Sequence, residues 1–109
     1  MNQERKEHIY YAKYTDEEIE VICRKALKKW GLGSQVLMAI EELSELIQVL
    51  AKADRKVNGS TREEIASEIA DVSLMLKQMQ VAFDVGPITI ASIEEEKLDR
   101  LKMLLDVKG

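Results

Sequence analysis

The strongest constraint on the fold of this chain is an apolar repeat with helical spacing in residues 36–50. The apolar side chains recur at alternating steps of four and three residues: Val36, Ile40, Leu43, Ile47 and Leu50. This spacing draws one continuous stripe along an α-helix and predicts packing against a partner helix. The same segment carries three carboxylates in five residues, in the sequence EELSE at 41–45. Any function assigned to this segment must explain why a helix that packs against another helix carries three carboxylates so close together.

A helix is also predicted before this segment. The sequence TDEE at 15–18 is a capping box, in which Thr15 caps the helix and Glu18 reaches back to it. Apolar residues then follow at helical spacing to about Trp30. The glycines of the loop GLGS end this helix, and Ser34 is expected to cap the next one.

Two more helices are predicted in the second half of the chain. Ser60 and Thr61 each begin a capping box, and an apolar stripe then reaches Phe83. The sequence SIEE at 92–95 is expected to cap a last helix. Between these helices, the residues VGPITIA are expected to break the helical pattern, with an extended conformation open to them. No strand pattern of useful length is present elsewhere, so the predicted fold class is all-α.

The length and composition fit one helical domain. The chain has 109 residues, of which 46% are apolar and 33% charged, a balance that supports folding and argues against disorder. We expect an N-terminal arm over residues 1–14 and a single four-helix, bundle-like domain over residues 15–109. A domain of this size buries a modest core, so assembly into a dimer or tetramer is expected.

Charge and composition exclude several kinds of partner. The net charge of −4 is unlike the clustered basic excess of proteins that bind nucleic acid backbones. The apolar runs are short and the N-terminus lacks a signal-peptide pattern, so neither membrane insertion nor secretion is indicated and a cytoplasmic location is expected. The single cysteine, Cys23, excludes an internal disulfide and is expected to be a buried apolar residue.

The acids of EELSE share one side of their helix. At about 100° per residue, Glu42 and Glu45 lie about 60° apart, with Met38 and Val49 one turn away on the same side. The later sequence EIAD repeats this spacing with Glu68 and Asp71. The two pairs meet only if their helices form an antiparallel hairpin and both pairs lie equally far from its turn. That condition requires the segment ADRKVNGS to be mostly loop.

Four gathered carboxylates favour a divalent cation. Burying ionised acids is costly unless they are paired or bind a metal, and mutual repulsion adds to that cost. Oxygen ligands select Mg²⁺, with Mn²⁺ as a substitute, over zinc, which prefers His and Cys. The alternative is that these are ordinary helix-surface acids neutralised by Lys or Arg.

The two acidic motifs and their surroundings resemble a known family. EELSE followed by EIAD resembles the EExxE and ExxD motifs of the MazG-like all-α nucleoside triphosphate pyrophosphohydrolases. The resemblance runs from about Trp30 to Leu105 and includes WGLGSQVLMAIEELSELIQVLAK, EEIASEIADVSLMLKQM and EEEKLDRLKML. It implies Mg²⁺-dependent hydrolysis of a nucleotide between its α and β phosphates. The resemblance also implies site roles, with metal ligands at Glu42, Glu45, Glu68 and Asp71 and a water-activating acid at Glu41.

Further residues are candidates for binding the nucleotide. Lys97 and Arg100 match the closing helix of the family, and Lys52 and Arg55 offer alternative cations for the phosphates. Each of these residues also has a plain interpretation as a surface charge, and Glu41 as an ordinary exposed acid.

The base of the nucleotide has candidate contacts of its own. Trp30 and Gln35 are candidates for stacking on the base and hydrogen bonding to it, although Trp30 also suits the edge of a helical core. A second aromatic for the base is absent near the motifs unless Tyr10, Tyr11 or Tyr14 folds over from the arm or from another subunit.

Three functions remain open from the sequence. The first is a pyrophosphohydrolase acting on ordinary or modified nucleoside triphosphates, assembled as a homodimer or homotetramer because the chain holds one copy of the motif pair. The second is a phosphoribosyl-ATP pyrophosphohydrolase, which shares the fold and the acidic motifs. The third is a helical oligomerisation or regulatory module without catalysis.

Overall fold

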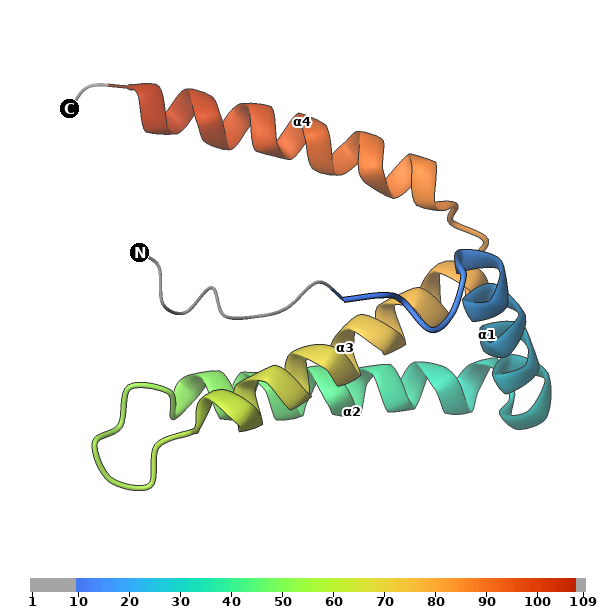
Figure 1. The fold of residues 1–109 in the computed structure, drawn as a ribbon, viewed down its shortest axis with the longest axis horizontal. Coiled ribbons are helices and arrows are strands. Elements are labelled where there is room, and N and C mark those ends of the chain that lie inside the picture. The colour runs from blue at the N-terminus through green and yellow to red at the C-terminus, as the bar shows by residue number, and fades with distance from the viewer. Residues whose placement is uncertain (1–9, 108–109) are drawn as a thin grey trace.

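The computed structural model of the chain describes residues 10–107, and this part is helical throughout its regular structure (Figure 1). It contains four helices: α1 (Asp16–Trp30), α2 (Leu32–Ala51), α3 (Arg62–Ala82) and α4 (Pro87–Asp106). The described range has no strand, so the predicted all-α class is confirmed. Of the predicted arm, residues 1–9 lie outside the described residues, and residues 10–14 precede α1 without forming a helix.

Two of the helices begin at the capping boxes found in the sequence. The Thr15 Oγ1 accepts a hydrogen bond from the Glu18 N–H, and the Glu18 carboxylate accepts one from the Thr15 N–H. Thr61 and Glu64 repeat this pair of bonds at the start of α3. Thr61, rather than Ser60, is therefore the cap of α3. Each box satisfies N–H groups that have no partner within the first turn of a helix.

The predicted cap of α2 at Ser34 is wrong. The helix α2 begins at Leu32, directly after Gly31, and has no side-chain cap. Gly31 adopts φ of 87° and its N–H donates to the Leu27 C=O at 2.8 Å. This left-handed φ, which glycine adopts without steric cost, ends α1 and turns the chain into α2 within one residue.

The predicted start of the last helix at Ser92 is also wrong. The helix α4 begins at Pro87, with Gly86 as its N-cap, so the residues following Pro87 in VGPITIA are helical rather than extended. Proline is favourable in the first turn because its fixed φ suits the helix and its missing N–H has no helical partner there. Proline therefore begins this helix.

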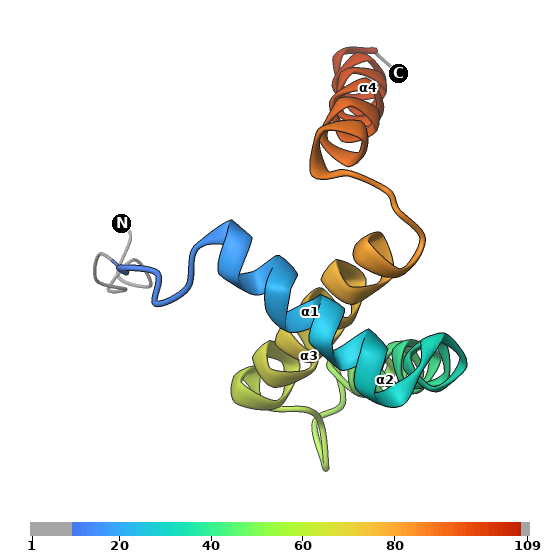
Figure 2. The same ribbon diagram turned by 90° about the vertical axis from the view of Figure 1, so that its right-hand side faces the viewer.

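The helices α2 and α3 form an antiparallel hairpin, which α1 crosses at the end where α2 begins (Figures 1 and 2). The loop between α2 and α3 is held to α2 by Ser60, whose Oγ donates to the Val49 C=O at 2.8 Å. The helix α4 projects away and makes no extended contact with the other three helices. The buried core of the described residues is small: Cys23, Gln35, Ala39, Val72 and Met75.

The stripe of α2 identified in the sequence does not pack within the chain. Ile40 and Ile47 are 56% and 66% exposed, whereas the side that meets the other helices carries Gln35 and Ala39, with Leu46 half-buried. These two sides lie about 100° apart around the helix. The helix therefore has two apolar sides, and the one with the more regular spacing is left uncovered by its own chain.

Candidate metal centre

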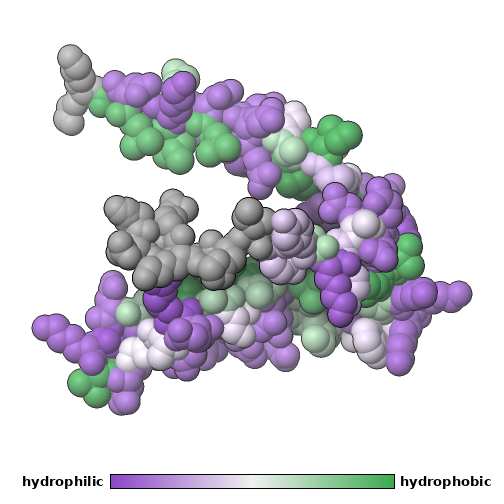
Figure 3. Space-filling model, viewed as in Figure 1, coloured by the Kyte–Doolittle hydropathy of each residue, from purple (hydrophilic) through white to green (hydrophobic). Residues whose placement is uncertain are grey.

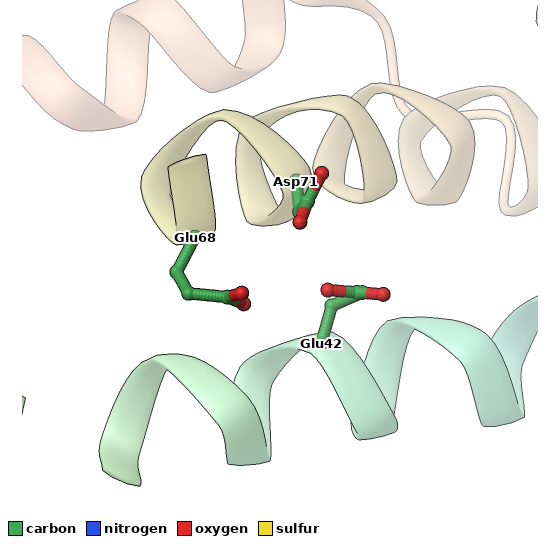
Figure 4. A group of neighbouring side chains, drawn as sticks. All are labelled: Glu42, Glu68 and Asp71. Atoms are coloured by element: carbon green, nitrogen blue, oxygen red, sulfur yellow. The ribbon is translucent and has the colours of Figure 1, made fainter. Parts of the chain in front are cut away.

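Three of the predicted metal ligands come together between α2 and α3. Glu42 projects from α2 toward Glu68 and Asp71 on α3 (Figure 4). Each residue offers one carboxylate oxygen, and these oxygens all lie within 4.8 Å of one another. Two oxygens that each lie about 2.1 Å from one Mg²⁺ are at most about 4.2 Å apart, so these side chains would need to close only slightly to share one cation.

The hairpin brings these acids together because their distances from its turn match. Glu42 lies nine residues before the end of α2 at Ala51, and Asp71 lies nine residues after the start of α3 at Arg62. At about 1.5 Å per residue, both acids are about 14 Å from the turn. The loop over residues 52–61 makes this match, as the predicted hairpin required.

The cluster raises the affinity of two of its acids for protons. Partial burial raises the pKa of Glu42 above its ordinary value, and the carboxylates of Glu45 and Asp71 raise it further. Partial burial also raises the pKa of Glu68, with Glu45 and Asp71 again adding to the effect. Both causes act against the charged form, so in the absence of a cation the folded protein opposes the ionisation of this site.

No side chain of the described residues neutralises the cluster. The Oε1 atoms of Glu42 and Glu68 are buried without a hydrogen-bond partner. The one ion pair among residues 10–107 joins Arg24 to Glu20 on α1. The structure therefore lacks the Lys or Arg partners that the helix-surface interpretation requires. An oxygen-only donor set with unpaired buried atoms fits a divalent cation.

The other two acids of EELSE lie beside this group. Glu45 is exposed and outside the group of three, yet its charge acts on both Glu42 and Glu68. Glu41 is exposed and is the weakest of the charges that act on Glu42. Glu45 and Glu41 therefore lie outside the group of three, and both are exposed.

The cations predicted to bind phosphate are placed differently from one another. Lys52 is half-buried at the C-terminal cap of α2, where its C=O accepts from the N–H groups of Arg55 and Ser60. Lys97 and Arg100 are exposed on α4. Because α4 lies apart from the hairpin, the single chain does not bring these two cations to the acids.

The residues predicted to contact a base also differ in exposure. Trp30 is 56% exposed at the end of α1, with the Lys29 ammonium 5.3 Å from its ring centroid. Gln35 is buried, seven residues before Glu42 and so on the same side of α2. Tyr10, Tyr11 and Tyr14 are exposed, and none of them covers the acids in the single chain.

Sequence reasoning missed Gln78. Its Oε1 is buried without a hydrogen-bond partner, and it lies seven residues after Asp71 on the same side of α3. Gln35 and Gln78 therefore lie at equal distances from the acids, on the side away from the turn of the hairpin. An uncharged amide gives no charge signal, and only its position two turns from Asp71 marks it in the sequence.

A groove of about 360 Å³ lies elsewhere, between α1, the end of α3 and the start of α4. Its lining includes Cys23, Lys77, Val81 and Pro87, and none of the clustered acids. Burial raises the pKa of the Cys23 thiol, while Lys77 lowers it and Glu20 raises it. Cys23 is 1% exposed, which confirms the predicted buried position and disfavours a reactive thiolate.

No family model, curated protein or solved structure matches this chain. Among the described residues, no helix is long and apolar enough to cross a membrane. The order of the acidic motifs and the geometry of the acids between α2 and α3 are the observations that bear on function.

Proposed function

We propose that the chain is a Mg²⁺-dependent nucleoside triphosphate pyrophosphohydrolase of the MazG-like type. The observation that carries this proposal is the meeting of Glu42, Glu68 and Asp71 across the hairpin. One oxygen of each lies within 4.8 Å of the others, and Glu42 and Glu68 each have a buried oxygen without a hydrogen-bond partner. The acids occur in the order ExxE, loop, ExxD that this class of enzyme uses, and no Lys or Arg of residues 10–107 forms an ion pair with them.

The chemistry follows from what these residues can hold and move. Glu42, Glu68 and Asp71 would hold Mg²⁺, or Mn²⁺ in its place, with Glu45 as the fourth ligand. When bound, the ion would supply positive charge that offsets the triphosphate and favours in-line attack. The Glu41 carboxylate accepts a proton from the water that attacks the α-phosphorus. The bond from the α-phosphorus to the bridging oxygen breaks, which gives a nucleoside monophosphate and pyrophosphate.

The remaining proposed contacts concern the substrate and the assembly. Lys97, Arg100 and Lys52 bind the β and γ phosphates, and Trp30 and Gln35 contact the base. The protein is cytoplasmic and acts as a homodimer or homotetramer, with a ribo- or deoxyribonucleoside triphosphate as substrate. The support for the roles of Lys97 and Arg100 is the resemblance of the closing helix and the exposure of both side chains.

The test is pyrophosphate release from canonical and modified nucleoside triphosphates, with Mg²⁺ and with a chelator. We expect release that requires Mg²⁺ and is lost in Glu42→Gln and Glu45→Gln. Glu63→Gln is the matched control, because Glu63 is an exposed acid on α3 outside the cluster. Silence across the panel, followed by turnover of phosphoribosyl-ATP, would assign that substrate instead.

A second measurement separates the metal ligands from the water-activating acid. Glu68→Gln should lose both turnover and the rise in melting temperature on adding Mg²⁺. Glu41→Gln should lose at least about 100-fold in turnover, as expected for a general base, and keep the Mg²⁺-dependent rise. A folded protein with neither a Mg²⁺ response nor turnover would indicate the non-catalytic module.

A further inference from the structure

Two buried amides lie at one level of the hairpin, and the proposed chemistry gives no role to one of them. Gln35 on α2 is 4% exposed, and Gln78 on α3 has a buried Oε1 without a hydrogen-bond partner. Gln35 lies seven residues before Glu42. Gln78 lies seven residues after Asp71. At about 1.5 Å per residue, both amides are therefore about 10 Å from the acids along the hairpin.

The Oε1 of Gln78 is an acceptor that the described residues leave unsatisfied. A buried acceptor without a partner costs free energy, and native proteins rarely leave one. Gln35 does not donate to this oxygen. The side chains one turn closer to the acids have no strong donor either: Met38, Ala39, Leu74 and Met75. A ligand that brings an N–H group to this position would supply the missing hydrogen bond.

Exposed apolar side chains lie between the amides and the acids. Met38 lies between Gln35 and Glu42 on α2, and is 43% exposed. Leu74 lies between Asp71 and Gln78 on α3, and is 50% exposed. By helical spacing, each lies within about 60° of the amide and the acid that flank it. We call Met38 and Leu74 the apolar strip.

The helix α4 does not cover the apolar strip. It makes no extended contact with the hairpin, and Figure 3 shows a gap between α4 and the other three helices. Within residues 10–107, the strip is therefore accessible to a ligand that also reaches the acids.

The order of these groups along the hairpin matches the order of groups in a nucleoside triphosphate. The acids that would hold the metal and the phosphates come first, the apolar strip follows, and the amides lie about 10 Å from the acids. That separation is comparable to the length of a nucleoside from its 5′ oxygen to the far edge of its base. Ligand sites commonly combine an apolar surface with a few polar groups that fix orientation.

We propose that Gln78, with Gln35 at the same level, hydrogen-bonds the edge of the nucleotide base while the face of the base lies on the apolar strip. This inference rests on the proposed function and names the bases that the site prefers. It makes Gln78 a specificity-determining residue, at a position that the acidic motifs do not include.

The unsatisfied atom of Gln78 indicates which bases these are. A glutamine amide presents an acceptor oxygen beside a donor nitrogen. Adenine and cytosine each present an amino group beside a ring nitrogen, so the amide can accept from the first and donate to the second. Guanine and uracil have a carbonyl oxygen in place of that amino group, which would set an acceptor against the Oε1 of Gln78. The preferred substrates are therefore adenine and cytosine nucleotides.

The first experiment measures binding without turnover. The α,β-methylene analogues of ATP, CTP, GTP and UTP are titrated calorimetrically in the presence of Mg²⁺. We expect the wild type to bind the ATP and CTP analogues at least about 10-fold more tightly than the other two. Gln78→Met, which keeps a similar volume without the amide, should reduce this ratio to about twofold or less.

Gln80→Met is the matched control for this titration. Gln80 is on the same helix but about 200° from Gln78, and it lines the separate groove beside α1. This variant should keep the wild-type ratio. Equal binding of all four analogues by the wild type, or a preference for the GTP and UTP analogues, would overturn the proposal.

The second experiment distinguishes a binding role of Gln78 from a structural one. Without nucleotide, Gln78→Met should be at least as stable as the wild type in urea, because it removes a buried acceptor that has no partner. Gln78→Leu repeats this test with a second apolar side chain. Lower stability of both variants would mean that the amide holds the fold together, and would overturn the proposal.

The third experiment separates this inference from the proposed function. Pyrophosphate release is compared for ATP and for purine riboside triphosphate, which lacks only the amino group. We expect kcat/KM of the wild type to be at least about 10-fold higher for ATP, and Gln78→Met to act on both about equally. A wild-type preference that Gln78→Met leaves unchanged would overturn the role of Gln78 alone. No binding of any analogue and no release from any nucleotide would overturn the proposed function as well.

Discussion

At the scale of single residues, Glu42 and Glu68 stand where the fold opposes their charge. Each is partly buried, has a buried oxygen without a partner, and faces other carboxylates. An ordinary surface acid has water or a basic neighbour instead. The two residues therefore make the metal-free protein less stable than the same hairpin with neutral side chains would be, and a bound cation removes that disadvantage.

The pH dependence of stability should show this cost. The folded pKa of Glu42 lies above its ordinary value of 4.5, so between pH 4.5 and that raised pKa Glu42 binds more protons in the folded state than in the unfolded state. Linkage then requires the free energy of unfolding to fall as pH rises through this range. We expect Glu42→Gln to flatten that fall and to be the more stable protein at pH 8 with a chelator, as measured by urea unfolding.

Glu63→Gln supplies the control for this experiment, since it removes a carboxylate outside the cluster and should keep the wild-type slope. A Glu42→Gln protein less stable than wild type at pH 8 would contradict the prediction. It would mean that the Glu42 carboxylate is a structural hydrogen-bond acceptor.

At the scale of the helices, the sequence correctly predicted the helix caps that depend only on contacts between residues close together in the chain. The boxes at Thr15 and Thr61 were correct because both partners of each box lie within four residues. Ser92 begins the similar sequence SIEE, whereas Ser34 lacks an acid three residues later; both predictions failed because α2 and α4 begin earlier, after Gly31 and at Pro87. The capping pattern therefore predicted the presence of these helices, and the first residue of a helix only at Thr15 and Thr61.

Long-range contacts explain what the sequence left open. Glu42 was correctly placed beside Glu68 and Asp71 because the hairpin distance follows from the loop between the helices, whereas Glu45 lies outside that group. The apolar stripe of α2 was identified, but the surface that packs against it was not. The spacing of residues shows which side of a helix is apolar and does not show what contacts that side. The position of α4 was unpredictable for the same reason. Gln78 was missed because the feature that marks it, a buried Oε1 without a hydrogen-bond partner, exists only in the folded chain.

The cap of α3 provides a prediction at this scale. Thr61→Ala removes the Oγ1 that accepts from the Glu64 N–H at 3.1 Å, and should lower the free energy of unfolding by about 1 kcal/mol. Ser92→Ala is the control, because Ser92 lies inside α4 and caps nothing. It should leave stability unchanged, as measured by urea unfolding of both variants. An equal loss in both would mean that the hydroxyl at Thr61 contributes nothing specific.

At the scale of the whole molecule, the chain exposes many large apolar side chains and buries only a small core. The buried apolar residues of the described range are Cys23, Ala39, Val72 and Met75, and a core this small stabilises a chain of 109 residues poorly. A larger apolar area is exposed on α2, α3 and α4, at residues such as Ile40, Ile47, Ile69 and Leu104. In the proposed homodimer or homotetramer, contacts between copies would bury part of this area, so folding and assembly should be coupled.

Coupled folding and assembly makes thermal stability depend on protein concentration. For a dimer that unfolds to separate chains, raising the concentration 100-fold stabilises it by about 2.7 kcal/mol, which raises the melting temperature by about 6 °C for two chains of this length. Calorimetry between 1 and 100 µM without nucleotide measures this shift. Ile47→Glu should lose the shift and melt at a lower temperature, while Gln48→Glu should keep it. A melting temperature independent of concentration in the wild type would show that one chain is stable alone. The exposed apolar side chains of α2 and α3, such as Ile47 and Ile69, would then need another explanation.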